Sequence, residues 1–214
     1  MENYSELIER CRNNEEEVII KGVAMGAVML SRMAPIYESG SVSKFQKIAL
    51  RFSQELKNIT TIEDFDILHE RFVESLKNEI KGQDGEKLSY GEAQKSINVF
   101  LKTYVDRSSR PHTSVAETIR PFLHVPLDSI MIKYFRENFR SDYSIYIAPA
   151  HHQVNEWIRD NNPTFTGKMP DKELSKLKNI CPEVYLAWQK WFRAIYPNKP
   201  VMLDTIWALE RERN

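Results

Sequence analysis

The sequence predicts an all-α protein, and three observations lead to that prediction. Apolar residues recur at helical spacing along most of the 214 residues. The hydrophobic fraction of 42% suffices for a folded core and is not that of a disordered chain. Seven glycines and ten prolines are too few for a low-complexity chain. This length allows two small lobes, which we expect at residues 1–82 and 83–214.

Three helices are predicted before the lobe boundary, over residues 15–37, 43–57 and 61–80. Gly22 and Gly26 in the first helix indicate close packing against a neighbour. The second helix carries one apolar stripe, made of Phe45, Ile48, Ala49, Phe52 and Leu56. Thr61 and Asp64 have the spacing of a helix-starting capping pair. The polar, glycine-containing stretch 81–87 is the clearest loop and separates the two lobes.

The second lobe is predicted to be helical over residues 89–104, 115–119, 129–139, 151–159, 181–195 and 202–211. Ser89 and Glu92 form a capping box, and Asp128 has the character of an N-cap. After the short helix at 115–119, Pro121 and Pro126 keep the chain extended up to Asp128. We expect loops at 106–114 and 160–170, and some strand character at 143–150.

Charge and cysteine content restrict the class of protein. Thirty Lys and Arg residues balance thirty Asp and Glu residues, which argues against a chain wrapped in nucleic acid but allows a local basic face. Two cysteines exclude a disulfide scaffold and fit a reducing compartment. The most apolar stretch, 18–36, contains Lys21 and Arg32, so it is not a membrane span. We expect a cytoplasmic protein without membrane contact.

The helix that begins at Ser89 has two faces. Its apolar face consists of Ala93, Ile97, Phe100, Leu101 and Tyr104. Lys95, Asn98 and Lys102 lie on the roughly opposite face, and periodicity alone favours an ordinary solvated surface there. Lys95 and Lys102 are seven residues apart, so the two amines lie nearly one above the other.

Two short elements, taken together, resemble the helix-hairpin-helix DNA glycosylase superfamily. Gly91-Glu92-Ala93-Gln94-Lys95 is similar to its Gly-x3-Lys element, and Val125-Pro126-Leu127-Asp128 to its Val-Pro-Val-Asp element. The closer similarity is to the archaeal branch that removes 8-oxoguanine. That branch has a second lysine seven residues on, here Lys102, and a comparably long interval from lysine to aspartate, here 33 residues. The resemblance covers residues 89–131.

The resemblance implies a two-lobed glycosylase fold, DNA as partner, no cofactor and no metal. It assigns Lys95 as nucleophile, Asp128 as its electrostatic partner and Lys102 as the alternative nucleophile. Such a lysine attacks C1′ of a flipped nucleotide in its neutral form, so its pKa has to fall from the ordinary value of about 10.4. The positive end of the helix and a second cation on the same face both act in that direction.

Further residues are candidates for contact with substrate or DNA. Those for the substrate lie in or beside the two elements or on the late aromatic helix: Gly91, Gln94, Asn98, His124, Trp188 and Trp191, with Phe192 and Trp157 as additional pocket walls. Core packing is the competing interpretation for the aromatic residues. Basic residues near the site are candidates for phosphate contact: Arg107, Arg110, Arg120 and Lys133.

Two other functions stay open at this stage. The same fold can serve as a catalytically silent module that binds DNA or protein. Arg107 and His112 have the Arg-x4-His spacing of HEPN ribonucleases, although Pro111 disfavours the regular helix on which that pair lies. His152 and Glu156 lack a third metal ligand nearby. We favour a monomer.

Overall fold

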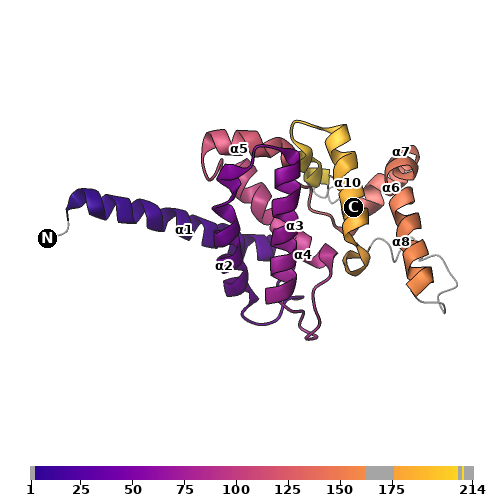
Figure 1. The fold of residues 1–214 in the computed structure, drawn as a ribbon, viewed down its shortest axis with the longest axis horizontal. Helices are drawn as coiled ribbons and strands as arrows, with labels where there is room; N and C mark the ends of the chain where they lie inside the picture. Colours follow the sequence, from indigo (N-terminus) through magenta and orange to yellow (C-terminus); the bar gives the residue numbers. More distant parts are fainter. Residues whose placement is uncertain (1–2, 162–175, 207–208, 210–214) are drawn as a thin grey trace. The chain divides into compact units, whose positions relative to one another are not determined.

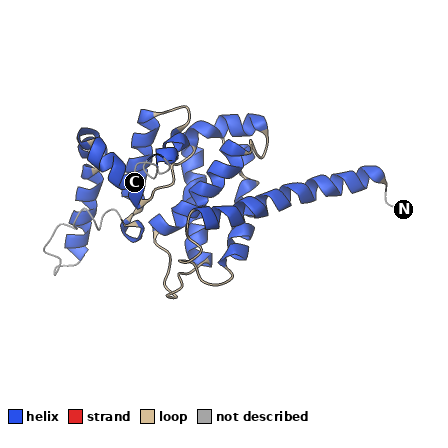
Figure 2. Cartoon of the chain, turned by 180° about the vertical axis from the view of Figure 1, so that it is seen from behind, coloured by secondary structure: helices blue, strands red, loops and turns tan. Residues whose placement is uncertain are grey.

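The computed structural model describes residues 3–161, 176–206 and 209. This part of the chain forms helices and loops without a β-strand, apart from two isolated bridges in the loop regions, Tyr37 with Gly82 and Lys81 with Lys87 (Figure 2). The prediction of an all-α fold is therefore confirmed. No helix in the described residues is both long and apolar enough to cross a membrane.

The chain divides into two compact units. Unit 1 comprises Met1–Leu88 and Ser96–Phe122, and unit 2 comprises Ser89–Lys95 and Leu123–Asn214. The chain therefore passes between the units within one helix, α4 (Tyr90–Leu101), after Lys95. The two-lobed arrangement and its boundary after residue 82 stay predictions.

Unit 1 contains α1 (Tyr4–Leu30), α2 (Ser41–Ser53), α3 (Ile62–Glu79), the second half of α4 and α5 (Thr113–Ile119) (Figure 1). A π-helical turn, Lys102–Arg107, follows α4, and two 3₁₀ turns cover Leu56–Asn58 and Arg120–Phe122. Phe45 of α2 packs on Phe72 of α3 and on Phe100 of α4, with ring centroids about 6 Å apart. These rings form the centre of the core of unit 1.

Helices α2 and α3 begin close to where the sequence predicts them. All five residues of the predicted α2 stripe are buried. The side chain of Thr61 accepts a hydrogen bond from the Asp64 backbone N–H, which starts α3 at Ile62. The apolar period therefore predicts both helices, and the Thr61 cap in addition predicts the start of α3.

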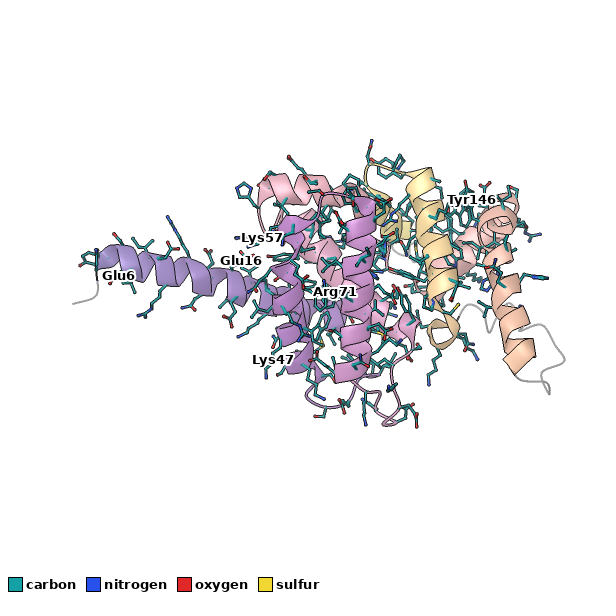
Figure 3. The ribbon with its side chains drawn as sticks, viewed as in Figure 1. Glu6, Glu16, Lys47, Lys57, Arg71 and Tyr146 are labelled. Carbon is teal, nitrogen blue, oxygen red and sulfur yellow. The ribbon has the colours of Figure 1, made fainter. Side chains whose placement is uncertain are left out.

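Helix α1 begins eleven residues before the predicted start at residue 15 and ends seven residues before the predicted end at residue 37. A capping box between Asn3 and Glu6 starts it, and Arg32, with a left-handed φ of 59°, and Pro35 follow its end. Its first half projects from α2 and α3, as the position of Glu6 in Figure 3 shows, whereas Glu16 lies where α1 reaches the rest of unit 1. The prediction of a helix over 15–37 was thus wrong at both ends.

Unit 2 contains the first residues of α4, then α6 (Ser129–Asn138), α7 (Arg140–Tyr146), α8 (Ala148–Asn161) and α10 (Pro182–Ile195). Two 3₁₀ turns cover Leu177–Asn179 and Pro200–Thr205. The strand character expected at 143–150 was wrong, because α7 and α8 include that stretch. A 3₁₀ turn replaces the start of the predicted last helix, and most of its remaining residues lie outside the described part.

The core of unit 2 is aromatic. Phe135 of α6 packs edge-on against Trp188, Trp191 and Phe192 of α10, with centroid distances of 5.0 to 6.3 Å. Both tryptophans are 1% exposed. This confirms the core-packing interpretation of the late aromatic residues and leaves no open surface on either tryptophan.

Candidate functional site

The start of α4 is closely packed. Ser89 and Glu92 form the expected capping box, in which the Ser89 N–H and hydroxyl both donate to Glu92 Oε2 at 2.9 and 2.8 Å. Gly91 lies directly against the backbone of Leu177, since a Cβ at this position would be 2.1 Å from the Leu177 carbonyl oxygen. The glycine of the Gly-x3-Lys element therefore allows close approach of the 3₁₀ turn.

A buried extended segment, Leu123–Leu127, leads to Asp128 and is held by two glutamine side chains. Gln189 of α10 accepts from the Val125 N–H at 2.8 Å and donates to the Val125 carbonyl at 3.0 Å. Gln94 of α4 donates to the Leu127 carbonyl at 3.2 Å. Both glutamines are at most 1% exposed. Because buried backbone groups need partners, these amides substitute for the neighbouring strand that the segment lacks.

Lys95 and Asp128, which the resemblance pairs, lie close together in unit 2. Asp128 Oδ1 accepts the backbone N–H groups of Ile130 and Met131 at 3.0 and 2.9 Å, as the N-cap of α6. Asp128 Oδ2 lies 3.9 Å from Lys95 Nζ, and the side chains are 22% and 15% exposed. The cap orients the carboxylate, and the buried Gln94 fixes the segment before it relative to α4.

The face of α4 that carries Asn98 and Lys102 is buried, so the expectation of a solvated face was wrong. Asn98 is fully buried, and its Oδ1 lies 2.7 Å from His69 Nε2 of α3. Lys102 is 6% exposed and opens the π-helical turn in unit 1. Tertiary contacts within unit 1 bury these polar residues, which periodicity cannot anticipate.

The remaining candidates for substrate contact are also enclosed. His124 is 2% exposed, and its Nδ1 lies 2.8 Å from the Tyr185 hydroxyl. Gln94 bonds to the Gly91 and Leu127 carbonyls, while Trp188 and Trp191 belong to the aromatic core. Each of these residues has a structural partner in this conformation. The side chain of Trp157 lies outside the described residues.

The four basic candidates differ in what surrounds them. Arg110 Nη1 donates to Glu16 Oε2 at 2.7 Å, and Arg120 Nε lies 3.0 Å from Asp106 Oδ1. Arg107 and Lys133 are exposed, in unit 1 and unit 2 respectively. Two of the four arginine and lysine side chains are therefore already engaged by carboxylates.

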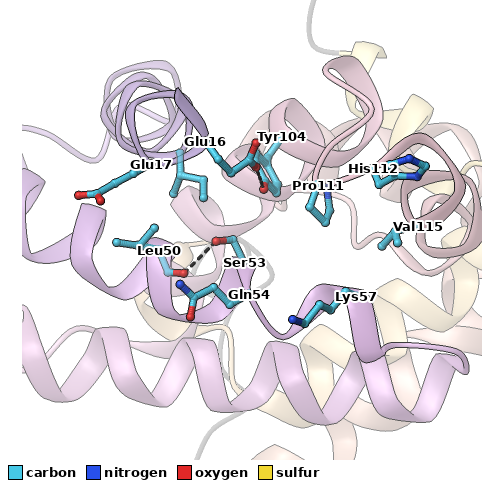
Figure 4. Close-up of a pocket in the computed structure, with 11 residues that line it drawn as sticks. Glu16, Glu17, Leu50, Ser53, Gln54, Lys57, Tyr104, Pro111, His112 and Val115 are labelled. Atoms are coloured by element: carbon cyan, nitrogen blue, oxygen red, sulfur yellow. Dashed lines mark hydrogen bonds between the residues drawn. The ribbon is translucent and has the colours of Figure 1, made fainter. Parts of the chain in front are cut away.

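Unit 1 contains a polar cluster that the sequence did not indicate. The Tyr104 hydroxyl donates a short hydrogen bond to Glu16, whose second oxygen accepts from Arg110. Burial, and then the hydrogen bond to Glu16, raise the pKa of Tyr104 well above its ordinary value. Glu16 and Tyr104 of this cluster line a cavity of about 480 Å³, and in Figure 4 their side chains point toward one another. Other lining residues are Leu50, Ser53, Lys57 and Val115.

No protein-family model, curated protein or solved structure matches this chain. Arg107 and His112, which have the HEPN spacing, do not lie on one helix, because Arg107 ends the π-helical turn and His112 is the N-cap of α5. Within residues 3–161 and 176–206, no three His, Cys, Asp or Glu side chains are grouped to hold a metal ion. Of the three residues to which the resemblance gives a catalytic role, the structure brings Lys95 and Asp128 together.

Proposed function

We propose that this protein is a DNA glycosylase that removes an oxidised or otherwise modified base, with Lys95 as its nucleophile. The observation that carries the proposal is the approach of Lys95 Nζ to 3.9 Å from Asp128 Oδ2. The two residues are 33 positions apart in the sequence and lie in the two elements that resemble the helix-hairpin-helix glycosylases. Partial exposure of both side chains leaves the pair accessible to a substrate.

The reaction would begin with the neutral amine of Lys95. Its Nζ attacks C1′ of the flipped nucleotide, the bond from C1′ to the base breaks, and the base leaves with the electron pair and takes up a proton. The attached nitrogen loses a proton, the bond from C1′ to the ring oxygen O4′ breaks, and O4′ takes up a proton, which gives a protonated Schiff base. Loss of a proton from C2′ and departure of the 3′ phosphate would then cleave the strand.

Asp128 would act on the developing charge. Its Oδ1 is held by the N-terminal turn of α6, so its Oδ2 keeps a fixed orientation toward Lys95. A carboxylate in this position stabilises the positive sugar and accepts a proton from the attacking amine. At 3.9 Å the two groups are not hydrogen-bonded, but an opposite charge at this distance still favours the ammonium, so Lys95 has to lose a proton before it attacks.

DNA is the proposed partner, and the cytoplasm is the proposed compartment. The exposed Arg107 and Lys133 are the basic candidates that can meet phosphates without first breaking an ion pair shown here. Cys11 and Cys181 are both free thiols, which is in keeping with a reducing compartment.

Borohydride trapping on labelled duplex oligonucleotides tests the proposal. The panel contains 8-oxoguanine, uracil, an abasic site and modified cytosines, because the base is not specified by the residues of the pair. Borohydride reduces the Schiff base to a stable amine, so an active lysine gives a covalent protein–DNA complex. We expect trapping by the wild-type protein and by Lys102→Met, and none by Lys95→Met.

Two variants of Asp128 separate its charge from its capping role. Asn caps helices about as well as Asp, so Asp128→Asn should keep the stability and lose base release, whereas Asp128→Ala should lose both. Trapping that survives Lys95→Met but disappears in a folded Lys102→Met protein would transfer the nucleophile to Lys102. Absence of trapping and of base release across the panel would refute the enzyme and favour the silent interaction module.

A further inference from the structure

Helix α1 has an outward face that the proposed function does not use. Its residues follow the alternating three- and four-residue spacing of a heptad, and all eight are exposed: Tyr4, Ile8, Cys11, Glu15, Val18, Gly22, Met25 and Met29. We call this face the outer stripe. The buried residues of α1 lie on the opposite side of the helix: Ile20, Ala24, Ala27 and Val28. One apolar stripe thus serves the fold of unit 1, and a second one faces outward.

The glycines of α1 point to a contact outside the chain. A Cβ at Gly22 or Gly26 would meet no atom of the described structure within 4 Å. The sequence-based expectation that these glycines pack against a neighbour is therefore not met within the described chain. Glycine weakens a helix relative to alanine, and its usual gain is close approach of another backbone. Gly22 lies on the outer stripe, and Gly26 lies one turn further on beside it.

The first half of α1 buries none of its described side chains. Residues 3–12, 14 and 15 are all exposed, Tyr4 at 84% and Ile8 at 52%. Isolated helices shorter than about 12–15 residues are marginal in water. A partner that covers the outer stripe would supply the missing stabilisation.

We propose that the outer stripe pairs with the same stripe of a second copy, antiparallel, to form a homodimer. In one register, every position of the stripe meets another: Tyr4 with Met29, Ile8 with Met25, Cys11 with Gly22, and Glu15 with Val18. The projecting half of each α1 then lies along the supported half of the other. Each α1 carries its own unit 1 on the side away from the seam, so the two copies of unit 1 lie at opposite ends. This dimer replaces the monomer that we favoured from the sequence.

The apolar area of the stripe is of the size that a dimer needs. Six large side chains on or beside it are between 39% and 84% exposed: Tyr4, Leu7, Ile8, Val18, Met25 and Met29. At about 180 Å² for a fully exposed large side chain, they offer about 600 Å² in each copy. Two copies bury about 1,200 Å², the lower bound for stable specific interfaces, before flanking polar groups are included.

Glu15 determines the orientation of the pair. A parallel pair would place Glu15 in the same layer as Glu15 of the second copy, where like charges repel. The antiparallel register places it against Val18 instead. Cys11 likewise faces Gly22 of the second copy, a small residue that leaves room for the thiol.

Sedimentation equilibrium between about 1 and 200 μM tests the dimer. We expect a shift from the 25.1 kDa monomer mass to twice that value as the concentration rises. Ile8→Lys should weaken the dimer at least tenfold. Glu9→Gln is the matched control, with the same change in net charge one residue along on another face, and should leave it unchanged. A wild-type mass of one copy throughout overturns the proposal, as does a dimer that Ile8→Lys leaves intact.

Gly22→Ala separates packing against a partner from stability of the helix. A methyl group there meets nothing in the described chain, so it should raise the thermal midpoint of the dilute monomer. The same methyl group should weaken the dimer, because it holds the two helices apart. A dimer strengthened by Gly22→Ala would overturn the close approach that we propose.

Disulfide cross-linking tests the orientation. With Cys181→Ser as background, and at a protein concentration high enough to offset the weakening that a side chain at position 22 should cause, Gly22→Cys should give on mild oxidation a disulfide between Cys11 of one copy and position 22 of the other. In the antiparallel register, two Cys11 residues are about 16 Å apart along the axis, beyond the reach of a disulfide. A disulfide between two Cys11 residues in the Cys181→Ser background would establish a parallel pair and overturn the register.

Discussion

Unit 1 and unit 2 each place a carboxylate beside a cation, and they do so differently. In unit 1, both oxygens of Glu16 accept direct hydrogen bonds, one from Tyr104 and one from Arg110. In unit 2, one oxygen of Asp128 is anchored by α6, and the other faces Lys95 beyond hydrogen-bond distance. A carboxylate whose two oxygens both accept direct hydrogen bonds from the protein holds its neighbours in place. One that is oriented by its cap and only approached by its cation can still interact with a third group.

The largest expected effect is at Gly91, where α4 enters the unit that contains Lys95 and Asp128. Gly91→Ala places a methyl group 2.1 Å from the Leu177 carbonyl oxygen, and backbone on both sides cannot move independently. We expect a loss of about 3–5 kcal/mol in the free energy of unfolding, measured by denaturant titration. Gly26→Ala, where the methyl group meets nothing described, is the control and should be neutral or stabilising. Equal stability of the two variants would contradict the close contact at Gly91.

Gln189 tests how the extended segment is held. Gln189→Leu keeps the apolar packing of α10 but removes the amide that hydrogen-bonds to the buried N–H and C=O of Val125. We expect a loss of about 2–3 kcal/mol in unfolding free energy. The neighbouring Lys190 is exposed, so Lys190→Leu should stay within about 0.5 kcal/mol of wild type. A similarly small effect of Gln189→Leu would show that the segment does not depend on the glutamine.

Tyr104 tests the hydrogen-bonded carboxylate of unit 1. Tyr104→Phe should cost about 1–3 kcal/mol, because the hydrogen bond to a half-buried, charged acceptor is lost. The pH dependence has a definite sign. The folded protein holds the phenolic proton more tightly than the unfolded chain, so wild-type stability should fall as the pH rises above the ordinary tyrosine pKa of about 10.

In the Tyr104→Phe variant that alkaline loss should be smaller, which chemical denaturation at pH 8, 10 and 11 would show. Tyr196 is 44% exposed, so Tyr196→Phe serves as the control and should follow the wild-type profile. The interpretation fails if both variants lose stability with pH as the wild type does.

The smallest effect concerns the two thiols. Burial raises the pKa of Cys181 to about 11, whereas Cys11 is exposed on α1. Because the thiolate is the reactive form, iodoacetamide at pH 8 should label Cys11 well before Cys181 in the dilute monomer. Mass spectrometry of tryptic peptides over time measures both rates. Faster labelling of Cys181 would contradict its burial at the start of α10.

Much of the fold could be predicted from local signals. Thr61 with Asp64, Ser89 with Glu92, and Asp128 were recognisable as caps, and each one caps a helix. The start of α1 was missed because polar and charged residues outnumber the apolar ones there, although Asn3 and Glu6 have capping-box spacing. Short, β-branched and aromatic runs such as 143–150 are ambiguous between strand and helix, and here packing on α10 accompanies the helix.

The site could be predicted only in part. The resemblance predicted that Lys95 and Asp128 act as a pair. Periodicity alone would have given Lys95 as a surface residue and Asp128 as an N-cap. The engaged states of Arg110 and Arg120 depend on Glu16 and Asp106, which no local pattern connects to them. Gln189 had a usable signal, since it follows Tyr185 and Trp188 at helical spacing on the buried side of α10. A polar residue on such a face requires a buried partner, which the sequence alone does not identify.

Two glutamine side chains hold the extended segment Leu123–Leu127. Their chemistry affects how the site responds to pH. A primary amide neither gains nor loses a proton between pH 2 and pH 12, so the attachment of Val125 to Gln189, and of Leu127 to Gln94, is the same in acid and in base. Histidine or glutamate in these places would release the segment at one end of that range. The glutamine attachments of the backbone that carries Asp128 are thus insulated from titration, and a change of activity with pH would report on the reacting groups or on His124, the buried titratable side chain of the same segment.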